Sequence, residues 1–198
     1  AHVLRLRSLR EHPEAFGSSY EDEALLTLES LVERLRPTAD RCLFGAWVDE
    51  ALVGTLHFSR STGKKIRHRA GLGAMYVAPE MRECGIGRAL LTTAIDYART
   101  LPDLEQIILA VTVGNQAART LYLAAGFTPT FVEKRYIKVD NVYCQEPKPK
   151  FAPDQTLFGR LTNPVVERST ELTPKSCRDY VVLVTTPTGN VPARGSVV

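Results

Sequence analysis

A short glycine-containing segment offers the clearest chemistry in the sequence. It runs from Pro79 to Arg88, between a predicted strand and a predicted helix. Gly85 and Gly87 let the backbone approach a ligand closely, and the first N–H groups of the helix have no partner within the helix. With the positive charge of Arg82 and Arg88, the segment predicts an anion site that suits a pyrophosphate. A Gly-x-Gly at a helix start can also be a plain turn. The segment is neither a Walker loop nor a dinucleotide fingerprint, because no Gly-Lys-Ser/Thr follows and a third glycine is missing.

A second polar group follows the next predicted strand. Asn115 comes 28 positions after Gly87 and opens a short predicted helix that carries Tyr122 and stops at Gly126. The Tyr122 hydroxyl could act as a general acid, and its alternative role is that of a core aromatic residue. Asn115 could contact a ligand and could equally be the N-cap of its helix.

The two segments together resemble the signature of the GNAT N-acetyltransferase superfamily. The first is Met75-Tyr76-Val77-Ala78-Pro79 followed by Arg82-x-x-Gly85-x-Gly87. The second is Val113-Gly114-Asn115-Gln116, with Ala118-Arg119, Leu121-Tyr122 and Gly126-Phe127 after it. The order and spacing of the two blocks are more specific than either block alone. The resemblance extends from the loop around Phe16 to about Tyr143.

The resemblance implies an N-acetyltransferase that uses acetyl-CoA as co-substrate and acetylates a primary amine by direct attack in a ternary complex. It implies that the strands over 72–77 and 107–113 splay, that the pantetheine arm lies in the gap, and that Tyr122 protonates the leaving thiolate. The residues that it implies for cofactor binding are Met75, Tyr76, Val77, Arg82, Glu83, Cys84, Gly85, Ile86, Gly87, Arg88, Asn115, Ala118 and Arg119.

The general base has no assignment. Some members of the superfamily carry a glutamate five positions before the motif asparagine, where this chain has Ala110. Four residues remain candidates by chemistry alone, namely His57, His68, Glu80 and Glu133, and a water relay would serve as well. His57 alternates with apolar neighbours, which favours a histidine on a sheet face without a catalytic role.

Two charged clusters bear on the acceptor. One cluster is acidic and consists of Glu11, Glu14, Glu21, Asp22 and Glu23. The resemblance implies that it borders the acceptor site, so it predicts a small cationic amine as the acceptor. The other is basic and reads as a solvated hairpin tip, with an acidic substrate or a nucleic acid as alternatives: Arg60, Lys64, Lys65, Arg67 and Arg69. Nucleic acid is disfavoured because no aromatic residues alternate with these charges.

Hydrophobic periodicity predicts the elements that position these residues. Two helices, around 3–9 and 25–35, are separated by a polar loop over 15–23. A hairpin over 42–58 turns at Asp49-Glu50, and a third strand covers 72–77. The pattern continues with a helix from Ile86 to Leu101 and a strand over 107–113 that is buried on both faces. It ends with the helix that Asn115 opens and a strand over 131–139. The predicted fold is therefore α/β (α+β): a mixed, mostly antiparallel sheet flanked by helices.

Both ends depart from the resemblance. The superfamily opens with a strand before its first helix, and no segment before the 3–9 helix predicts that strand. We therefore expect a GNAT domain over 1–146 without its N-terminal strand, followed by a proline-rich tail over 147–198 that is extended or disordered. Pro147 and Pro149 lie where the last strand is expected, so this strand is predicted to be short or to lie at an edge. These departures keep a non-catalytic acyl-CoA-binding module open, beside a protein N-terminal or lysine acetyltransferase.

Composition excludes several other classes of protein. The 198 residues are 44% apolar and 24% charged, with a net charge of +3, which is typical of a globular protein and gives no indication of nucleic-acid binding. No apolar run is long enough to span a membrane, and we expect a cytoplasmic protein, possible as a homodimer. The cysteines are scattered and predict neither a metal site nor a needed disulfide: Cys42, Cys84, Cys144 and Cys177.

Overall fold

The chain forms one mixed β-sheet with helices on both sides. The computed structural model describes residues 1–143, 155–162, 181–186 and 189–192. Eight strands form the sheet, in the order β10-β9-β1-β2-β3-β4-β8-β5. The helical elements are α1 (His2–Glu11), η1 (Pro13–Ala15), α2 (Tyr20–Ala24), α3 (Leu28–Leu35), η2 (Pro79–Met81), α4 (Ile86–Arg99) and α5 (Gln116–Ala124). The strands are β1 (Arg41–Val48), β2 (Ala51–Arg60), β3 (Arg69–Val77), β4 (Gln106–Thr112), β5 (Thr128–Lys134), β8 (Gln155–Thr162), β9 (Val181–Thr186) and β10 (Gly189–Pro192), with β6 (Lys138–Val139) and β7 (Val142–Tyr143) as a separate pair.

The sheet is antiparallel except for one pair of strands. β1 and β2 form the predicted hairpin, β2 pairs with β3 in the same way, and β8 pairs antiparallel with both β4 and β5. β3 and β4 are parallel, and their ladder contains three pairs, from Arg69–Gln106 to Gly71–Ile108. The mixed, mostly antiparallel sheet that the sequence predicted is confirmed.

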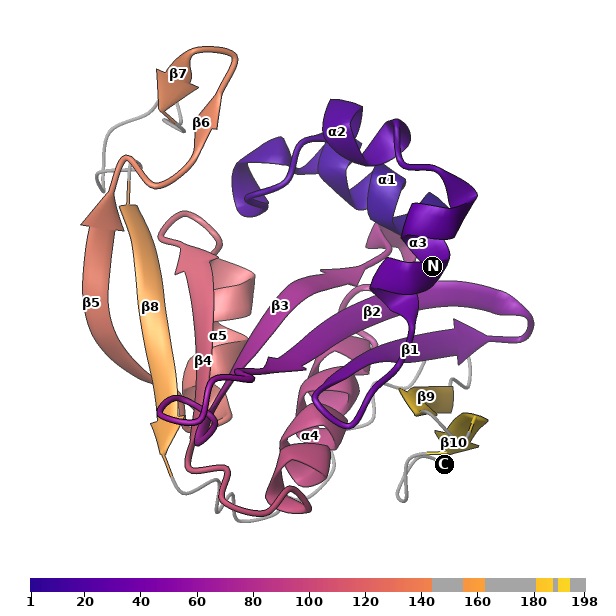
Figure 1. Ribbon diagram of the computed structural model, residues 1–198. Coiled ribbons are helices and arrows are strands. Elements are labelled where there is room, and N and C mark those ends of the chain that lie inside the picture. The colour runs from indigo at the N-terminus through magenta and orange to yellow at the C-terminus, as the bar shows by residue number, and fades with distance from the viewer. Residues whose placement is uncertain (144–154, 163–180, 187–188, 193–198) are drawn as a thin grey trace.

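The two faces of the sheet differ in what covers them. Figure 1 shows α1, α2 and α3 grouped on one side of the β1–β3 region and α4 on the other. The main apolar core lies against α4, whose buried side chains meet those of the strands: Phe44, Leu56, Phe58 and Ile107 from the sheet, and Ile86, Leu90, Leu91 and Ile95 from the helix. Burial of each of these large side chains contributes about 1.5–3 kcal/mol, so this core fixes the position of α4 on the sheet.

The sequence located the helices well but misjudged two details. The region 15–23, predicted as a loop, contains α2, which Ser19 caps by accepting a hydrogen bond from the Asp22 N–H at 3.1 Å. The strand over 107–113 was predicted to be buried on both faces, whereas burial alternates along β4 and Ala110 is exposed. The reason is that Ile107 and Leu109 point into the core that α4 covers, whereas Ala110 points to the opposite face of the sheet.

The strand that pairs with β5 comes from beyond the proline pair. β8 lies between β4 and β5, with Phe158 opposite Ala110 and Phe131. The prediction of a last strand that is short or at an edge is therefore wrong: it has eight residues and two neighbours. The sequence misled because the prolines at 147 and 149 lie in the connection before the strand. Residues 144–154, which contain them, lie outside the described residues.

A second segment of the predicted tail joins the other end of the sheet. β9 pairs antiparallel with β1, and β10 pairs with β9. The side chain of Val182 on β9 is 0% exposed and belongs to the main core. Residues 155–162, 181–186 and 189–192 are thus strands within the same sheet as the strands of residues 1–143. The edge of the sheet beside β1 is covered by β9.

The burial of Val182 predicts a specific loss of stability. Val182→Ala removes apolar contacts from the core, and we expect the free energy of unfolding to fall by about 1–3 kcal/mol. Val181→Ala, on the same strand, is the matched control because Val181 is 43% exposed. Urea denaturation of both variants measures the difference. Equal effects of the two substitutions would show that β9 does not pack as described.

Candidate active site

The centre of the candidate site is the point where β3 and β4 stop pairing. Their last pair joins Gly71 to Ile108, and beyond it the β4-facing side of β3 has no strand partner among the described residues. The other side of β3 continues to pair with β2 as far as Val77. Polar backbone groups that leave a ladder need other partners. The stretch Met75–Val77 is therefore suited to an extended ligand that carries amide groups.

A bulge adjusts β3 just before this stretch. Ala74 has a φ of 50°, in the left-handed region, and the register with β2 shifts between Thr55 and His57. A bulge places an extra residue on one strand and redirects the side chains that follow it. The side chain of Met75 consequently lies close to Gly87 and to Tyr122, which come from two different helices.

The loop between η2 and α4 is the segment for which the sequence predicts an anion site. Glu83 and Gly85 both have left-handed φ values, 63° and 78°, and Gly85 caps α4 without a side-chain hydrogen bond. No backbone acceptor among the described residues receives the N–H groups of Ile86, Gly87 or Arg88. Successive N–H groups after left-handed residues form a concave cradle for anions, and the positive end of the 14-residue helix α4 adds to it.

Gly87 allows α4 to approach β3 closely. A Cβ at this position would lie 3.3 Å from the Met75 Cε atom and 3.4 Å from the Leu121 Cδ2 atom. Any larger side chain would have to displace these neighbours. The glycines of this loop therefore serve two purposes, the backbone turn at Gly85 and the close packing at Gly87.

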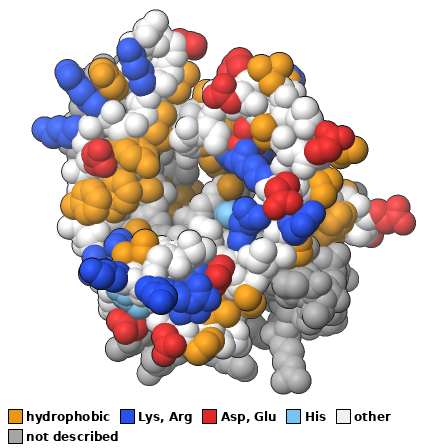
Figure 2. Space-filling model, viewed as in Figure 1, with side chains coloured by type: hydrophobic (Ala, Val, Ile, Leu, Met, Phe, Trp, Pro, Cys, Tyr) orange, Lys and Arg blue, Asp and Glu red, His pale blue; other side chains and the backbone are white. Residues whose placement is uncertain are grey.

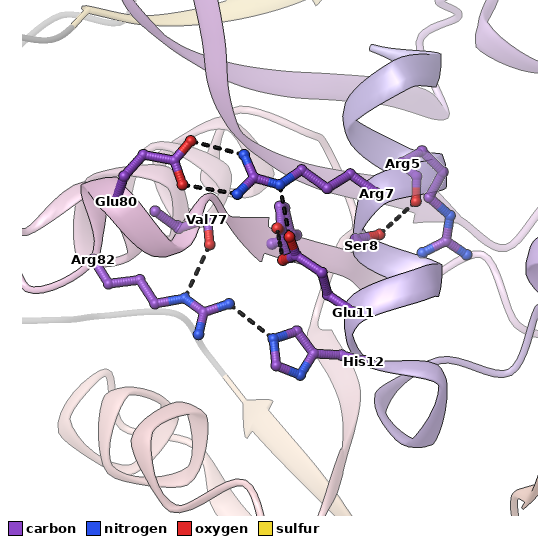
Figure 3. A network of polar contacts seen from close by, with 9 residues as sticks. Arg5, Arg7, Ser8, Glu11, His12, Val77, Glu80 and Arg82 are labelled. Atoms are coloured by element: carbon purple, nitrogen blue, oxygen red, sulfur yellow. Dashed lines mark hydrogen bonds and ion pairs between the residues drawn. The ribbon is translucent and has the colours of Figure 1, made fainter.

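A polar network joins the loop to α1, and Figure 3 shows its members. Arg7 donates two hydrogen bonds to the Glu80 carboxylate, at 2.7 and 2.9 Å, and a third to Glu11. The Tyr76 hydroxyl donates to the other oxygen of Glu11. Through these contacts α1 is tied both to η2 and to the end of β3.

Arg82 lies in the same network. Its Nε–H donates to the Val77 carbonyl at 3.1 Å, and its Nη2 lies 3.0 Å from Nε2 of His12. A guanidinium group only donates, so Nε2 of His12 is the acceptor of this contact, and Nδ1 faces Glu14 at 3.3 Å. The Arg82 side chain is thus held beside the anion site by α1 as well as by β3.

The second block lies as predicted, at the start of and along α5. Asn115 Oδ1 accepts a hydrogen bond from the Ala118 N–H at 3.1 Å, so Asn115 is the N-cap of α5. Arg119 contacts the Val113 carbonyl and Gln116, each at 3.4 Å, and its Nε atom is buried without a hydrogen-bond partner in the described structure. Gly126, with a φ of 87°, ends the helix.

Tyr122 has an unusual hydroxyl contact. The hydroxyl lies 3.3 Å from the sulfur of Met75, and the ring packs edge-on against Phe127. Burial raises the pKa of Tyr122 to about 12, so the phenol keeps its proton throughout the physiological range. A protonated phenol that points at a sulfur atom is a group able to donate a proton to a thiolate.

The structure brings most of the predicted site residues to one place. Met75, Gly87 and Tyr122 approach one another, and Tyr76, Val77 and Arg82 share the polar network that adjoins them. Cys84 in the loop is disulfide-bonded, so the expectation that the chain needs no disulfide is wrong there, whereas Cys42 is free and buried. The described residues contain no cluster of three or more metal-ligating side chains.

The α1 half of this network was not predicted from the sequence. Arg7, His12 and the pairing of Glu11 lie more than 60 positions away from their partners, and no motif marks them. The one available signal was the spacing of Arg7 and Glu11, which is typical of an ion pair on a helix face.

Comparisons with known proteins agree with this geometry. A sequence model of the Acetyltransferase (GNAT) family matches residues 6–127, more than half of the chain. The chain belongs to the GNAT acetyltransferase family. This GNAT chain is 33% identical over 88 residues to a spermidine N(1)-acetyltransferase of Vibrio cholerae, covering 41% of the chain and 51% of the relative. It is 31% identical over 124 residues to a mycothiol acetyltransferase of Geodermatophilus obscurus, and the match covers 61% of this chain and 40% of that relative. The chain thus spans about half of the first relative's length and less than half of the second's.

Solved structures show the same fold. A GNAT-family acetyltransferase from Streptococcus pneumoniae superposes with a TM-score of 0.63 at 20% identity, covering 80% of this GNAT chain and 92% of that one. Mycobacterium smegmatis RimJ in complex with CoA-disulfide superposes with a TM-score of 0.61 at 23% identity, and the match covers 82% of this chain and 75% of that one. No helix in the described part of the chain is long and apolar enough to cross a membrane.

The ion pair between α1 and η2 predicts a pH-dependent contribution to stability. Hydrogen bonding from Arg7 lowers the pKa of Glu80 from 4.5 to about 2. A lowered pKa means that the contribution is complete above pH 4.5 and disappears as the pH falls to about 2. Because the pair is exposed, we expect Glu80→Gln to lower the free energy of unfolding by less than about 1 kcal/mol near pH 7.

Thermal denaturation of the wild type and of Glu80→Gln between pH 7 and pH 2 measures this effect. Glu133→Gln is the control, because Glu133 is exposed and forms no ion pair with a described residue. A difference between wild type and Glu80→Gln that stays constant over this range would contradict the assignment.

Proposed function

We propose that this GNAT protein transfers the acetyl group of acetyl-CoA to the primary amine of a small molecule. The observation that carries the proposal is the Tyr122 hydroxyl, which its raised pKa keeps protonated, at 3.3 Å from a sulfur atom beside the end of β3. The family uses acetyl-CoA. The cradle of free N–H groups at the start of α4 and the unpaired side of β3 fit the pyrophosphate and the amide-containing arm of that molecule.

Each part of the site has a role in this proposal. The backbone N–H groups from Glu83 to Arg88, in the loop and at the start of α4, bind the pyrophosphate. The positive charges of Arg82 and Arg88 lie beside it. The backbone of Met75–Val77 binds one side of the pantetheine arm. The first turn of α5, with Asn115, Ala118 and Arg119, binds the other side of the arm. The buried Nε–H of Arg119, which lacks a partner, is available to such a ligand.

The transfer itself is a direct displacement. The amine nitrogen forms a bond with the thioester carbon, the C–S bond breaks, and Tyr122 gives its proton to the departing thiolate sulfur. A backbone N–H of β3 stabilises the charge on the carbonyl oxygen. The proton that the amine loses goes to water. Burial lowers the pKa of His57, which keeps its imidazole neutral near pH 7, but nothing shows contact between His57 and an amine, so no base is assigned.

Two similar proteins bear on the acceptor. The names of the relatives specify spermidine and mycothiol, which favours a small molecule over a protein terminus or a lysine side chain. The acidic cluster gives a cationic acceptor less support than the sequence indicated. Glu23 is bonded by Arg5 and Arg34, and Glu11 and Glu14 have partners as well, so Glu21 and Asp22 remain.

The alternative of a binding module without turnover has lost its basis. It rested on a missing strand at one edge of the sheet and a proline-broken strand at the other. β9 covers the first position and β8 completes the second. A cytoplasmic location remains part of the proposal, since acetyl-CoA is the co-substrate.

Removal of the Tyr122 hydroxyl tests the catalytic step. We expect Tyr122→Phe to lower kcat by about 10²–10⁴-fold with little change in acetyl-CoA affinity, because the ring remains and only the acid is lost. Thiol release over a panel of amines measures kcat, and calorimetric titration measures affinity. Tyr97→Phe is the control, since Tyr97 is also half-buried but packs against Phe44 and Phe58. Unchanged turnover in Tyr122→Phe, or binding without thiol release in the wild type, would contradict the proposal.

The pH dependence provides a separate test. A raised pKa leaves Tyr122 protonated at all pH values below about 12, so loss of the acid cannot limit the rate near pH 9. We therefore expect kcat/KM to rise as the amine loses its proton and then to level off. A descending limb below pH 10 in the wild type that Tyr122→Phe abolishes would show that the pKa of Tyr122 is much lower.

A further inference from the structure

The basic segment over 60–69 is not a uniform solvated tip. Arg60 is buried, and its guanidinium donates to the carbonyl groups of Arg67 and Pro102, both at 2.6 Å. Arg67 forms two hydrogen bonds with the Asp40 carboxylate, at 3.0 and 2.9 Å. Arg69 differs from both, because its side chain makes no hydrogen bond or ion pair with any described residue.

Arg69 lines a cavity of about 340 Å³. Beyond the last pair of their ladder, Gly71 and Ile108, β3 and β4 leave a wedge-shaped gap between them. The cavity lies at the base of this wedge, since its lining includes both residues. The other polar residues of the lining are Ser59, Ser61 and Arg60, whose guanidinium is bonded to the two carbonyl groups, and no carboxylate belongs to the lining. A guanidinium beside hydroxyl groups, without a competing acid, is a set of donors suited to an anion.

The cavity lies on the face of the sheet to which His57 and Gly73 also belong, and this face continues along β3 towards Met75. Ser59 is paired with Gly71, His57 with Gly73, and Gly71 with Ile108, so these residues share a face. A Cβ built on Gly73 would meet nothing within 4 Å, and Ala110 on β4 is exposed. Small residues thus leave an open floor between the cavity and the bulge before Met75.

The surroundings of this floor are positively charged on one side and apolar on the other. The pKa of His57 is lowered by burial and, in second place, by the charges of three neighbouring guanidinium groups, from Arg41, Arg34 and Arg5. Glu23 bonds two of them, and the buried Nε of Arg41 has no partner in the described structure. Opposite Ala110, Phe158 stacks on Phe131 with ring centroids 4.3 Å apart.

Figure 2 shows the same distribution. A hollow lies near the centre of the view, Lys and Arg side chains gather to its right and below it, and a group of apolar side chains lies to its left, over the β5 and β8 region of Figure 1. Such a face favours a negatively charged molecule with an apolar part over a polyamine.

We propose that the cavity lined by Ser59, Ser61, Arg69, Gly71 and Ile108 binds a carboxylate group of the acceptor. This inference rests on the proposed amine acetylation and specifies its substrate class: a primary amine that also carries a carboxylate. Gly71 and Met75 are four residues apart, which would be about 13 Å along a regular extended strand. The bulge at Ala74 makes the span shorter than this. The amine and the carboxylate of the preferred acceptor are therefore joined by a chain that spans less than about 13 Å and lies over Gly73.

Three series of amines with matched chain lengths test the proposal. They are linear ω-amino carboxylates, the corresponding alkylamines and the corresponding diamines, each assayed by thiol release with the full chain and acetyl-CoA. We expect the highest kcat/KM for an amino carboxylate of intermediate to long chain. Arg69→Gln should lower kcat/KM for the amino carboxylates by about tenfold to a hundredfold, mainly through KM, and should leave the alkylamines almost unaffected.

The matched control is Lys64→Gln, which removes the same charge from an exposed position outside the cavity and should not change the preference. If Arg69→Gln does not fold, Ser61→Ala removes a hydroxyl from the lining and should weaken the same acceptors selectively. Two results would overturn the carboxylate site while leaving amine acetylation intact. One is a kcat/KM for diamines or alkylamines as high as that for the amino carboxylates. The other is an equal loss of kcat/KM for all three series in Arg69→Gln. No thiol release with any amine would overturn the proposed function and this inference with it.

Discussion

The early end of the parallel ladder between β3 and β4 is the constraint on which the rest of the structure depends. Three pairs hold the two strands at one end, and beyond Gly71 they diverge. The divergence leaves the backbone of Met75–Val77 without a strand partner on one side, and it also opens the cavity beside Arg69. A sheet with a continuous ladder at this position would have neither feature. Both proposed ligand sites, for acetyl-CoA and for the acceptor, follow from the same wedge in the sheet.

Elements from distant parts of the chain keep the wedge in place. α4 holds the β3 side through its buried face, and Gly87 allows it to come within contact of Met75. α1 is tied to the anion-binding loop through Arg7 and Glu80 and to β3 through Glu11 and Tyr76. β8 supports β4 from the other side along seven paired positions. The site is consequently sensitive to packing in places that do not contact a ligand.

The sequence predicted the parts of this arrangement that depend on local chemistry. The glycines at 85 and 87, the cap at Asn115 and the stop at Gly126 follow from backbone requirements that a sequence displays directly. It could not predict which segments pair at the edges of the sheet. Pro147 and Pro149 seemed to break the last strand, and the pairing of β9 with β1 joins segments more than 130 positions apart. Nor could it separate Arg60, Arg67 and Arg69, whose different roles depend on carbonyl groups, a carboxylate and a cavity supplied by other elements.

Amide hydrogen exchange with and without acetyl-CoA tests the central claim most directly, because the claim concerns backbone groups that lack partners. The account predicts that acetyl-CoA slows exchange in two short regions, the loop from Glu83 to Arg88 and the end of β3 from Met75 to Val77. The hairpin of β1 and β2, whose N–H groups are already paired, should change little. Binding that protects other regions and leaves both of these unchanged would contradict the account.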